Sequence, residues 1–231
     1  MNVKGLDWDS DFFGIRIGRA EIASDEDATR LVSQVNSLKD SFDLIYVFAR
    51  HGLAFTANKA KLVDEKTVYS LKEFPRFEKK SNVMVWDKDR EVTGDLLHLA
   101  LVSGTFSRFR SDNRFPVGSY ERLYSRWIEQ SVHHAIATEV FCYMEDDAPR
   151  GMVTLNRKAD VGTIGLVAIH ENYQHRGIGS AMMRHVVRFA QEHDCGKLSV
   201  TTQLENVPAC KLYEKMGFQV ESVTDVWHWW L

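Results

Sequence analysis

Residues Gln174–Met183 read QHRGIGSAMM, and this stretch decides the fold. It follows an apolar run of strand length, Val161–Ile169, and it opens a run in which Ile178 and later apolar residues recur at helical spacing. A strand, a glycine-rich turn and a helix together predict an anion site, because the first-turn amides point outward unpaired and the helix dipole favours negative charge. Gly177 and Gly179 let the backbone approach a phosphate where a Cβ would obstruct it.

Two common phosphate loops are excluded by the neighbouring residues. A Walker loop needs a lysine before its final hydroxyl residue, whereas Gly179 is followed directly by Ser180. A dinucleotide fingerprint needs a third glycine and an acidic residue after the next strand, and Met182 and Thr202 stand near those places. The loop therefore predicts neither nucleotide hydrolysis nor dinucleotide binding.

A second motif lies one strand further along the chain. Its pattern, NxxAxxLYxxxGF, consists of Asn206, Ala209, Leu212, Tyr213, Gly217 and Phe218. Together with QxxGxG, it resembles the GNAT superfamily of acetyl-CoA-dependent N-acetyltransferases over about residues 138–231. The resemblance implies an α/β fold with the mixed central sheet of the GNAT type, and acetyl-CoA as co-substrate.

A narrower resemblance extends over more of the chain. The segments LDWDSDFFG, SGTFSRFRSDNRFP and the C-terminal NVPACKLYEKMGFQVESV with WHWW are similar to bacterial dTDP-fucosamine (dTDP-4-amino-4,6-dideoxygalactose) acetyltransferases. This implies acetylation of the amine of a nucleotide-linked amino sugar. The same segments are also consistent with an architecture shared by enzymes with other acceptors.

The GNAT resemblance assigns roles to individual residues. Tyr213 is the expected acid that protonates the leaving thiolate. The alternative is a tyrosine of the hydrophobic core whose hydroxyl group is hydrogen-bonded within the protein. The remaining residues are expected to contact the cofactor. The loop would surround its pyrophosphate, the backbone of the strand would run along its pantetheine arm, and one further residue would contact it at the start of a helix. They are Gln174, His175, Arg176, Gly177, Ile178 and Gly179 of the loop, Val167, Ala168 and Ile169 of the strand, and Asn206.

The general base and the acceptor site stay open at this level. His170, Glu205, His133 and His134 are candidates for the base by residue type alone. A polar and aromatic segment is expected to supply the acceptor site, with a solvated loop as the alternative. It comprises Ser107, Arg108, Arg110, Asp112, Arg114 and Phe115.

Hydrophobic periodicity predicts the order of elements along the chain. Helical spacing marks residues 25–38 and 119–132, and strand-like runs mark 42–49, 66–71 and 82–87. After a hairpin at residues 137–156, the pattern continues with the strand, loop and helix around QHRGIGSAMM, and then with strand, helix and a last strand from Phe218. The polar run 87–95 suggests a border, with a smaller N-terminal α/β domain at 1–93 and a GNAT acetyl-CoA-binding catalytic domain at 94–231.

Composition excludes several other classes of protein. The net charge of −3 gives no reason to expect nucleic acid as a partner, and no window approaches the length of a membrane span. The three scattered cysteines suggest neither a disulfide framework nor a zinc site, and the histidines have no ligand spacing, so no metal is expected. A reducing cytoplasm fits this pattern. The WHWW ending indicates core or a homodimer surface.

These observations lead to one functional hypothesis and two rivals. The hypothesis is an N-acetyltransferase that moves acetyl directly from acetyl-CoA to a primary amine, the amino group of a dTDP-linked 4-amino-4,6-dideoxy sugar used in surface polysaccharide biosynthesis. The first rival acetylates another amine, such as a protein N-terminus, a polyamine or an antibiotic. The second is a non-catalytic acyl-CoA-binding module.

Overall fold

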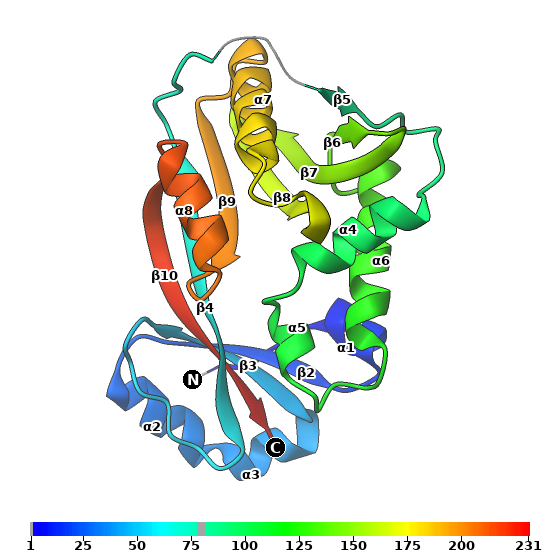
Figure 1. Cartoon of the computed structure of the whole chain (residues 1–231). Coiled ribbons are helices and arrows are strands. Elements are labelled where there is room, and N and C mark those ends of the chain that lie inside the picture. The colour runs from blue at the N-terminus through cyan, green and yellow to red at the C-terminus, as the bar shows by residue number, and fades with distance from the viewer. Residues whose placement is uncertain (1, 78–81) are drawn as a thin grey trace.

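The computed structural model describes residues 2–77 and 82–231, which form one ten-stranded mixed sheet with helices on both faces (Figure 1). The strand order is β1-β2-β3-β10-β4-β9-β8-β7-β6-β5. The strands are β1 (Lys4–Gly5), β2 (Ile17–Ile22), β3 (Leu44–Arg50), β4 (Ala60–Leu71), β5 (Val83–Val85), β6 (Glu139–Glu145), β7 (Ala148–Lys158), β8 (Val161–Ile169), β9 (Lys197–Gln203) and β10 (Gln219–Trp230). The helices are α1 (Asp7–Phe13), α2 (Asp25–Ser33), α3 (Val35–Ser41), α4 (Gly94–Ser103), α5 (Arg108–Ser111), α6 (Ser119–Val132), the 3₁₀ turn η1 (Glu171–Tyr173), α7 (Ile178–Glu192) and α8 (Val207–Lys215).

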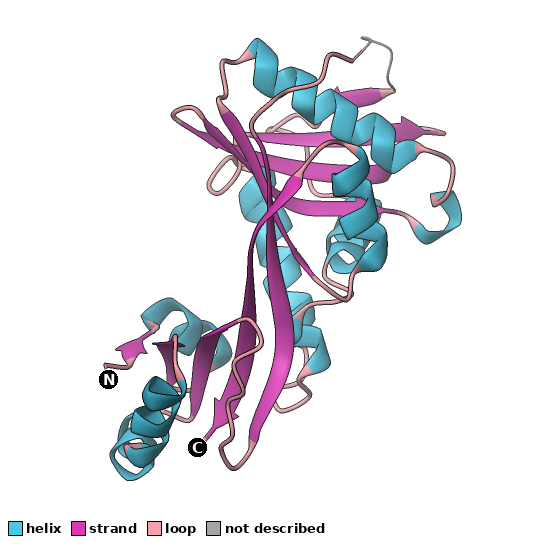
Figure 2. Cartoon of the chain, turned by 90° about the vertical axis from the view of Figure 1, so that its left-hand side faces the viewer, coloured by secondary structure: helices cyan, strands magenta, loops and turns pink. Residues whose placement is uncertain are grey.

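Two long strands, β4 and β10, join the two ends of the molecule (Figure 2). Strand β10 pairs antiparallel with β3 on one side and with β4 on the other, and β4 pairs with β9. Strand β4 therefore comes from the N-terminal part of the sequence but lies between two strands of the C-terminal part. The sheet is continuous across the predicted domain border at residue 93. The division into two separate domains stays a prediction. Met1 and residues 78–81, which belong to the predicted N-terminal domain, lie outside the described residues.

Alternating side chains of the strands separate the helices into two layers. On one face, Phe141 and Val153 pack with residues of α7 and α8. On the opposite face, Val140 and Met152 pack with residues of α4 and α6. Helices α2 and α3 cover β2 and β3 in a separate cluster that includes Trp229. The site described below opens where these layers meet the N-terminal strands.

The structure confirms the predicted helix at 119–132 and the strand at 161–169, and it corrects or extends the predicted elements at three places. The amphipathic run 25–38 breaks at Gln34 into α2 and α3. The last strand extends to Trp230, because its second half enters the sheet between β3 and β4. Helix α4 was not predicted. Its Leu96, Leu99 and Ala100 are fully buried, and a helix that is apolar nearly all round has no amphipathic stripe to reveal it.

A buried polar network fixes the end of β10 against the loop after α5. The carboxylate of Asp112 accepts hydrogen bonds from His228 Nδ1 at 2.7 Å, Trp230 Nε1 at 3.0 Å and Arg114 Nε at 2.8 Å. Burial opposes ionisation of Asp112, but these hydrogen bonds outweigh it and hold the pKa of its carboxyl group below the usual range. The tryptophan and histidine side chains of the WHWW ending thus contact residues of this protein's own interior.

Asp112→Asn is expected to destabilise the fold by about 3 kcal/mol, because the buried His228 and the partly exposed Arg114 lose the carboxylate that accepts their hydrogen bonds. The measurement is the urea midpoint of unfolding followed by tryptophan fluorescence. Asp89→Asn is the matched control, since Asp89 is exposed in a turn, and its midpoint should not change. Equal midpoints for the two variants would show that the network does not hold this part of the molecule together.

Candidate active site

Strands β8 and β9 separate in the middle of the sheet. They pair in parallel only from Val161/Lys197 to Ile164/Val200, after which β8 follows β7 and β9 follows β4. The β7–β8 register shifts at the same level, and the Oγ1 atom of Thr154 accepts the backbone N–H of Leu166 at 2.8 Å. A bulge of this kind redirects a strand and ends its pairing. The result is an opening between the two strands.

The strand residues predicted to line the pantetheine arm lie beside this opening. Val167 lines the cavity that occupies it. Ala168 is buried on the α4 and α6 side, and Ile169 packs near the start of α7. The structure therefore brings the three residues to the predicted edge, with their side chains divided between the two faces of the sheet.

The loop after β8 places unpaired amides at its end. Gly177 has φ +80° and caps α7 without a side-chain hydrogen bond, and His175 has φ +60°. The first-turn N–H groups of α7 thus face outward from a tight turn, an arrangement that binds anions. A Cβ on Gly179 would lie 3.3 Å from Leu212 Cδ2, so the glycine also permits close packing of α7 on α8. Ile178 is buried beneath the loop.

Two side chains of the loop have structural partners. Gln174 Nε2 donates to the carbonyl of Ile169 at 3.3 Å and ties the loop to the end of β8. Arg176 donates to the carbonyl of Asn172 at 2.9 Å, stacks over Tyr173 at 4.7 Å and lies 3.7 Å from Glu145. The guanidinium of Arg176 therefore supports the loop, and a charge contact to phosphate stays a prediction.

Helix α8 places Asn206 and Tyr213 on the opposite side of the opening. Asn206 is the N-cap of α8, its Oδ1 accepting from Ala209 at 3.3 Å, and both Asn206 and Tyr213 line the cavity. Tyr213 is 2% exposed, and among the described residues its hydroxyl has no hydrogen-bond partner. Burial, followed by the neighbouring Cys210, raises the pKa of Tyr213 above its ordinary value. The phenol is therefore protonated at neutral pH and able to donate.

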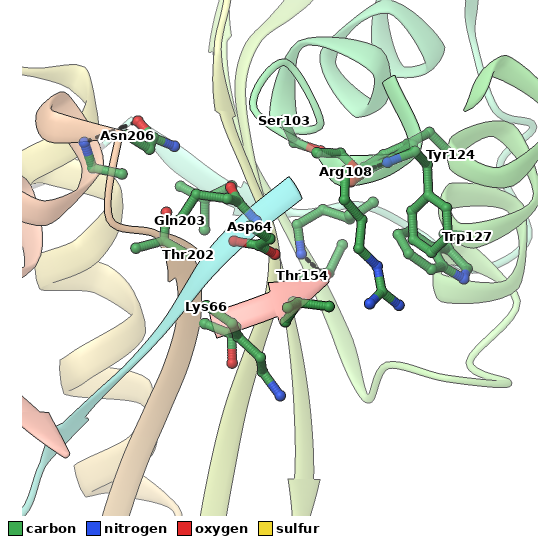
Figure 3. A pocket seen from close by; sticks show the side chains of 18 of the residues that line it. Asp64, Lys66, Ser103, Arg108, Tyr124, Trp127, Thr154, Thr202, Gln203 and Asn206 are labelled. Carbon is green, nitrogen blue, oxygen red and sulfur yellow. Dashed lines mark hydrogen bonds between the residues drawn. The ribbon is translucent and has the colours of Figure 1, made fainter. Parts of the chain in front are cut away.

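A cavity of about 550 Å³ continues from Tyr213 toward the N-terminal strands. Its walls come from β4, β8 and β9 on one side and from the end of α4, α5 and α6 on the other. Figure 3 shows Asp64 and Gln203 on the sheet side, and Arg108, Tyr124 and Trp127 on the helix side. The volume falls in the range of small-molecule sites, roughly 300–1,000 Å³.

Comparison with known proteins now assigns the fold. Residues 104–218 match the model of the acetyltransferase (GNAT) family. This part of the chain belongs to the GNAT family. The resemblance seen in QxxGxG and in the Asn206–Phe218 motif is thereby confirmed at the level of the superfamily, as is the mixed α/β fold. Acetyl-CoA is the co-substrate of GNAT acetyltransferases.

Individual similar proteins match this chain over different lengths. N-alpha-acetyltransferase 30 of Xenopus laevis is 33% identical over 57 residues, which cover 25% of this chain and 21% of that protein. The spore coat polysaccharide biosynthesis protein SpsD of Bacillus subtilis is 22% identical over 138 residues, covering 60% of this chain and 47% of the relative. The structure of a GCN5-related N-acetyltransferase from Kribbella flavida superimposes with a TM-score of 0.54 at 10% identity, covering 92% of this chain and 80% of the other.

Asp64 is a site residue that sequence reasoning missed. It lies on β4 next to a register shift, and its Oδ1 atom is buried without a hydrogen-bond partner in the described part of the chain. Burial raises the pKa of Asp64 to about 6, although Arg108, Gln203 and Lys66 oppose the shift. The local sequence VDEK does not predict that the side chain of its aspartate is buried. Only the folded sheet brings β4 beside the GNAT opening.

The general-base candidates chosen by residue type do not line the cavity. His170 caps η1, its Nδ1 atom accepting from the backbone N–H of Asn172 at 3.3 Å. Glu205, His133 and His134 are exposed outside the cavity. These four residues are poorly placed to deprotonate an acceptor in this GNAT fold, whereas the carboxylate of Asp64 lies in the cavity wall.

The predicted acceptor segment divides into three parts. Ser107 and Arg108 line the cavity, as expected for an acceptor site. Arg110 is exposed on the other side of α5. The others have structural contacts: the partly exposed Arg114 binds the buried Asp112, and Phe115 packs against Phe13 in a neighbouring core cluster.

Two groups of possible metal ligands occur among the described residues. His98, His170 and Glu171 form one group, and the other comprises His51, Glu65 and Asp225. Direct hydrogen bonds already account for their proximity, with His98 Nε2 at 2.9 Å from Glu171 and His51 Nδ1 at 2.7 Å from Asp225. The absence of a bound metal stays a prediction. None of the helices in the described ranges has the length and apolar character needed to cross a bilayer.

Gly177→Ala is expected to raise the Kd for acetyl-CoA about tenfold, or 1.4 kcal/mol. Alanine resists the positive φ, so relief of the strain turns the first-turn amides of α7 away from the phosphate. Isothermal titration calorimetry measures the change. Gly52→Ala is the matched control, because Gly52 has φ +78° and an equally open surrounding in a distant turn. Both variants should lose about 1 kcal/mol of stability, and an unchanged Kd for Gly177→Ala would contradict the assigned role of the loop.

Proposed function

We propose that this protein is an acetyl-CoA-dependent N-acetyltransferase that moves acetyl directly to a primary amine. The observation that carries the proposal is the joint placement of the unpaired amides of α7, the β8–β9 opening and the Tyr213 hydroxyl around one cavity. Acetyl-CoA supplies an activated thioester. The glycine turn fits its pyrophosphate, because Gly177 and Gly179 keep the amides clear of side-chain carbons.

The residues of this chain then divide the work of the reaction. Loop amides from Gln174 to Gly179 hold the pyrophosphate, while the backbone of residues 167–169 pairs with the pantetheine arm as an added strand would. Asn206 contacts the cofactor at the start of α8. Tyr213 donates its proton to the leaving thiolate, because its hydroxyl is protonated and has no competing partner among the described residues.

Asp64 receives the acceptor amine in this proposal. Its carboxylate lies in the cavity wall, where it accepts an N–H hydrogen bond from the ammonium group and then takes the proton that must leave before attack. Cys210 is unsuited to carry the acetyl group, since it is buried and its Sγ atom lies 3.7 Å from the carbonyl of Gln203. This supports transfer to the amine in one step.

The proposed acceptor is the amino group of a dTDP-linked 4-amino-4,6-dideoxy sugar used in surface polysaccharide biosynthesis. Its support is the partial similarity to SpsD, a polysaccharide biosynthesis protein, together with a cavity that extends well beyond the opening. A protein N-terminus is the rival favoured by the match to N-alpha-acetyltransferase 30. A cytoplasmic location and a homodimer belong to the same proposal, and light scattering would test the dimer.

The decisive experiment is an acetyl-CoA consumption assay with nucleotide amino sugars, peptides, polyamines and aminoglycosides. Fastest turnover with dTDP-4-amino-4,6-dideoxygalactose supports the proposal, and preference for a peptide or polyamine replaces the acceptor but keeps the reaction. Calorimetric binding of acetyl-CoA without turnover on any amine would favour an acyl-CoA-binding module. Failure to bind acetyl-CoA would contradict the whole scheme.

A further inference from the structure

The far end of the cavity contains a guanidinium group that has no hydrogen-bond or ion-pair partner among the described residues. Arg108 extends from α5 into the cavity (Figure 3), where it lies 4.2 Å from the ring of Tyr46 and 4.8 Å from that of Phe109. Within residues 2–77 and 82–231, its guanidinium makes no hydrogen bond or ion pair. A guanidinium carries five N–H donors, and leaving them unmet in a cavity costs folding free energy.

Other arginines near Arg108 have partners for their guanidinium groups. Arg114 has two contacts to Asp112 and a third to the carbonyl of Lys59, so it is fully engaged in structure. Arg19, which also lines the cavity, pairs with Glu21 at 2.8 Å. The donors of Arg108 are held between aromatic rings and face open space, as in a binding site that awaits its ligand.

The electrostatic surroundings favour an anion at this point. Arg19, Lys66 and Arg108 line the cavity, and Asp64 is the carboxylate that faces them from its wall. The ammonium group of Lys66 likewise has no hydrogen bond or ion pair within the described ranges. Burial, followed by the charges of Arg19 and Arg108, lowers the pKa of Lys66. The positive potential is local, because the whole chain carries a net charge of −3.

We propose that Arg108, assisted by Lys66, forms a subsite for an anionic group of the acceptor, a phosphate or a carboxylate. The guanidinium fork binds two oxygens of such a group in parallel, and the ammonium of Lys66 adds a point charge. The inference rests on the proposed function in placing the acceptor here. It adds that the acceptor amine is carried by a molecule with negative charge, which the polycationic aminoglycosides and polyamines lack.

Calorimetry on the CoA-saturated protein tests this subsite without any turnover. CoA blocks the α7 loop, so a second anion must bind elsewhere. The probes are inorganic pyrophosphate, thymidine diphosphate and N-acetylglycine. Binding of at least one is expected, tighter at low salt, and the tightest probe distinguishes a phosphate source from a carboxylate source.

Variants on α5 locate the binding. Arg108→Met keeps the length and packing of the side chain, and it should weaken the bound probe at least tenfold. Arg108→Lys should fall between it and the wild type, because it keeps charge but loses the fork. Arg110→Met is the matched control, being exposed two residues away on the same helix, and should bind as the wild type does.

Two results would overturn the subsite: no binding of any of the three probes, or equal binding by Arg108→Met and wild type. Both outcomes are separable from failure of the proposed function. A protein that acetylates an uncharged amine and ignores the anions would keep its function and lose the subsite. One that acetylates nothing, yet loses probe binding in Arg108→Met, would keep the subsite and lose the function.

Discussion

Tyr213→Phe is expected to lower kcat about a hundredfold while leaving the Kd for acetyl-CoA unchanged. The substitution keeps the ring, which packs 5.7 Å from Tyr69 and 6.0 Å from Phe218, and removes only the hydroxyl. Because that hydroxyl has no hydrogen-bond partner in the described part of the chain, its loss leaves the fold unchanged. The thiolate would then leave without a proton donor, so the defect should appear in kcat and not in binding.

Tyr69→Phe is the matched control for this experiment. Tyr69 is equally buried and close to Tyr213, but its hydroxyl donates to Glu214 at 3.1 Å instead of facing the cavity. Its activity should remain near the wild-type value, with a small loss of stability. Steady-state kinetics with a thiol-detecting reagent gives kcat, and calorimetry gives the Kd. Full activity of Tyr213→Phe would remove Tyr213 from the mechanism.

Asp64→Asn is expected to lower kcat/KM about a hundredfold and to abolish an acidic limb of the pH profile near pH 6. Burial raises the pKa of Asp64 to about 6, and only the ionised carboxylate can accept the amine proton. Wild-type activity should therefore be present above pH 6 and fall as the pH drops through that value. The amide side chain of the variant does not titrate, so this limb should disappear.

The same substitution should not reduce stability, which separates catalysis from folding. A buried carboxylate oxygen without a partner opposes folding, and an uncharged amide removes that cost. Glu65→Gln is the control, because side chains alternate along β4 and Glu65 lies toward His51 and away from the cavity. Unchanged kcat/KM in Asp64→Asn, or a pH limb that survives in it, would exclude Asp64 as the proton acceptor.

The sequence alone predicted those parts of the site that lie within a single loop or helix. The glycine turn and the segment from Asn206 to Phe218 each form one strand-to-helix or helix-to-strand connection, so their spacing alone reveals them. Asp64 and Arg108 could not be found in this way. They lie on elements that have no motif and meet only because β4 joins the C-terminal strands and α5 packs across the opening. The burial of these two side chains, and the lack of a hydrogen-bond partner among the described residues for Asp64 Oδ1 and for the Arg108 guanidinium, result from that packing.

The placement of β10 has a consequence for how the molecule is made. Strands β3 and β4 leave the ribosome early, yet β10 lies between them and contains residues 219–230. Until those residues have been synthesised, both strands present open edges, which are templates for pairing with other chains. Contacts between residues so distant in sequence also slow folding. Folding of this protein should therefore depend on chaperones that shield the edges of β3 and β4 until β10 has been synthesised.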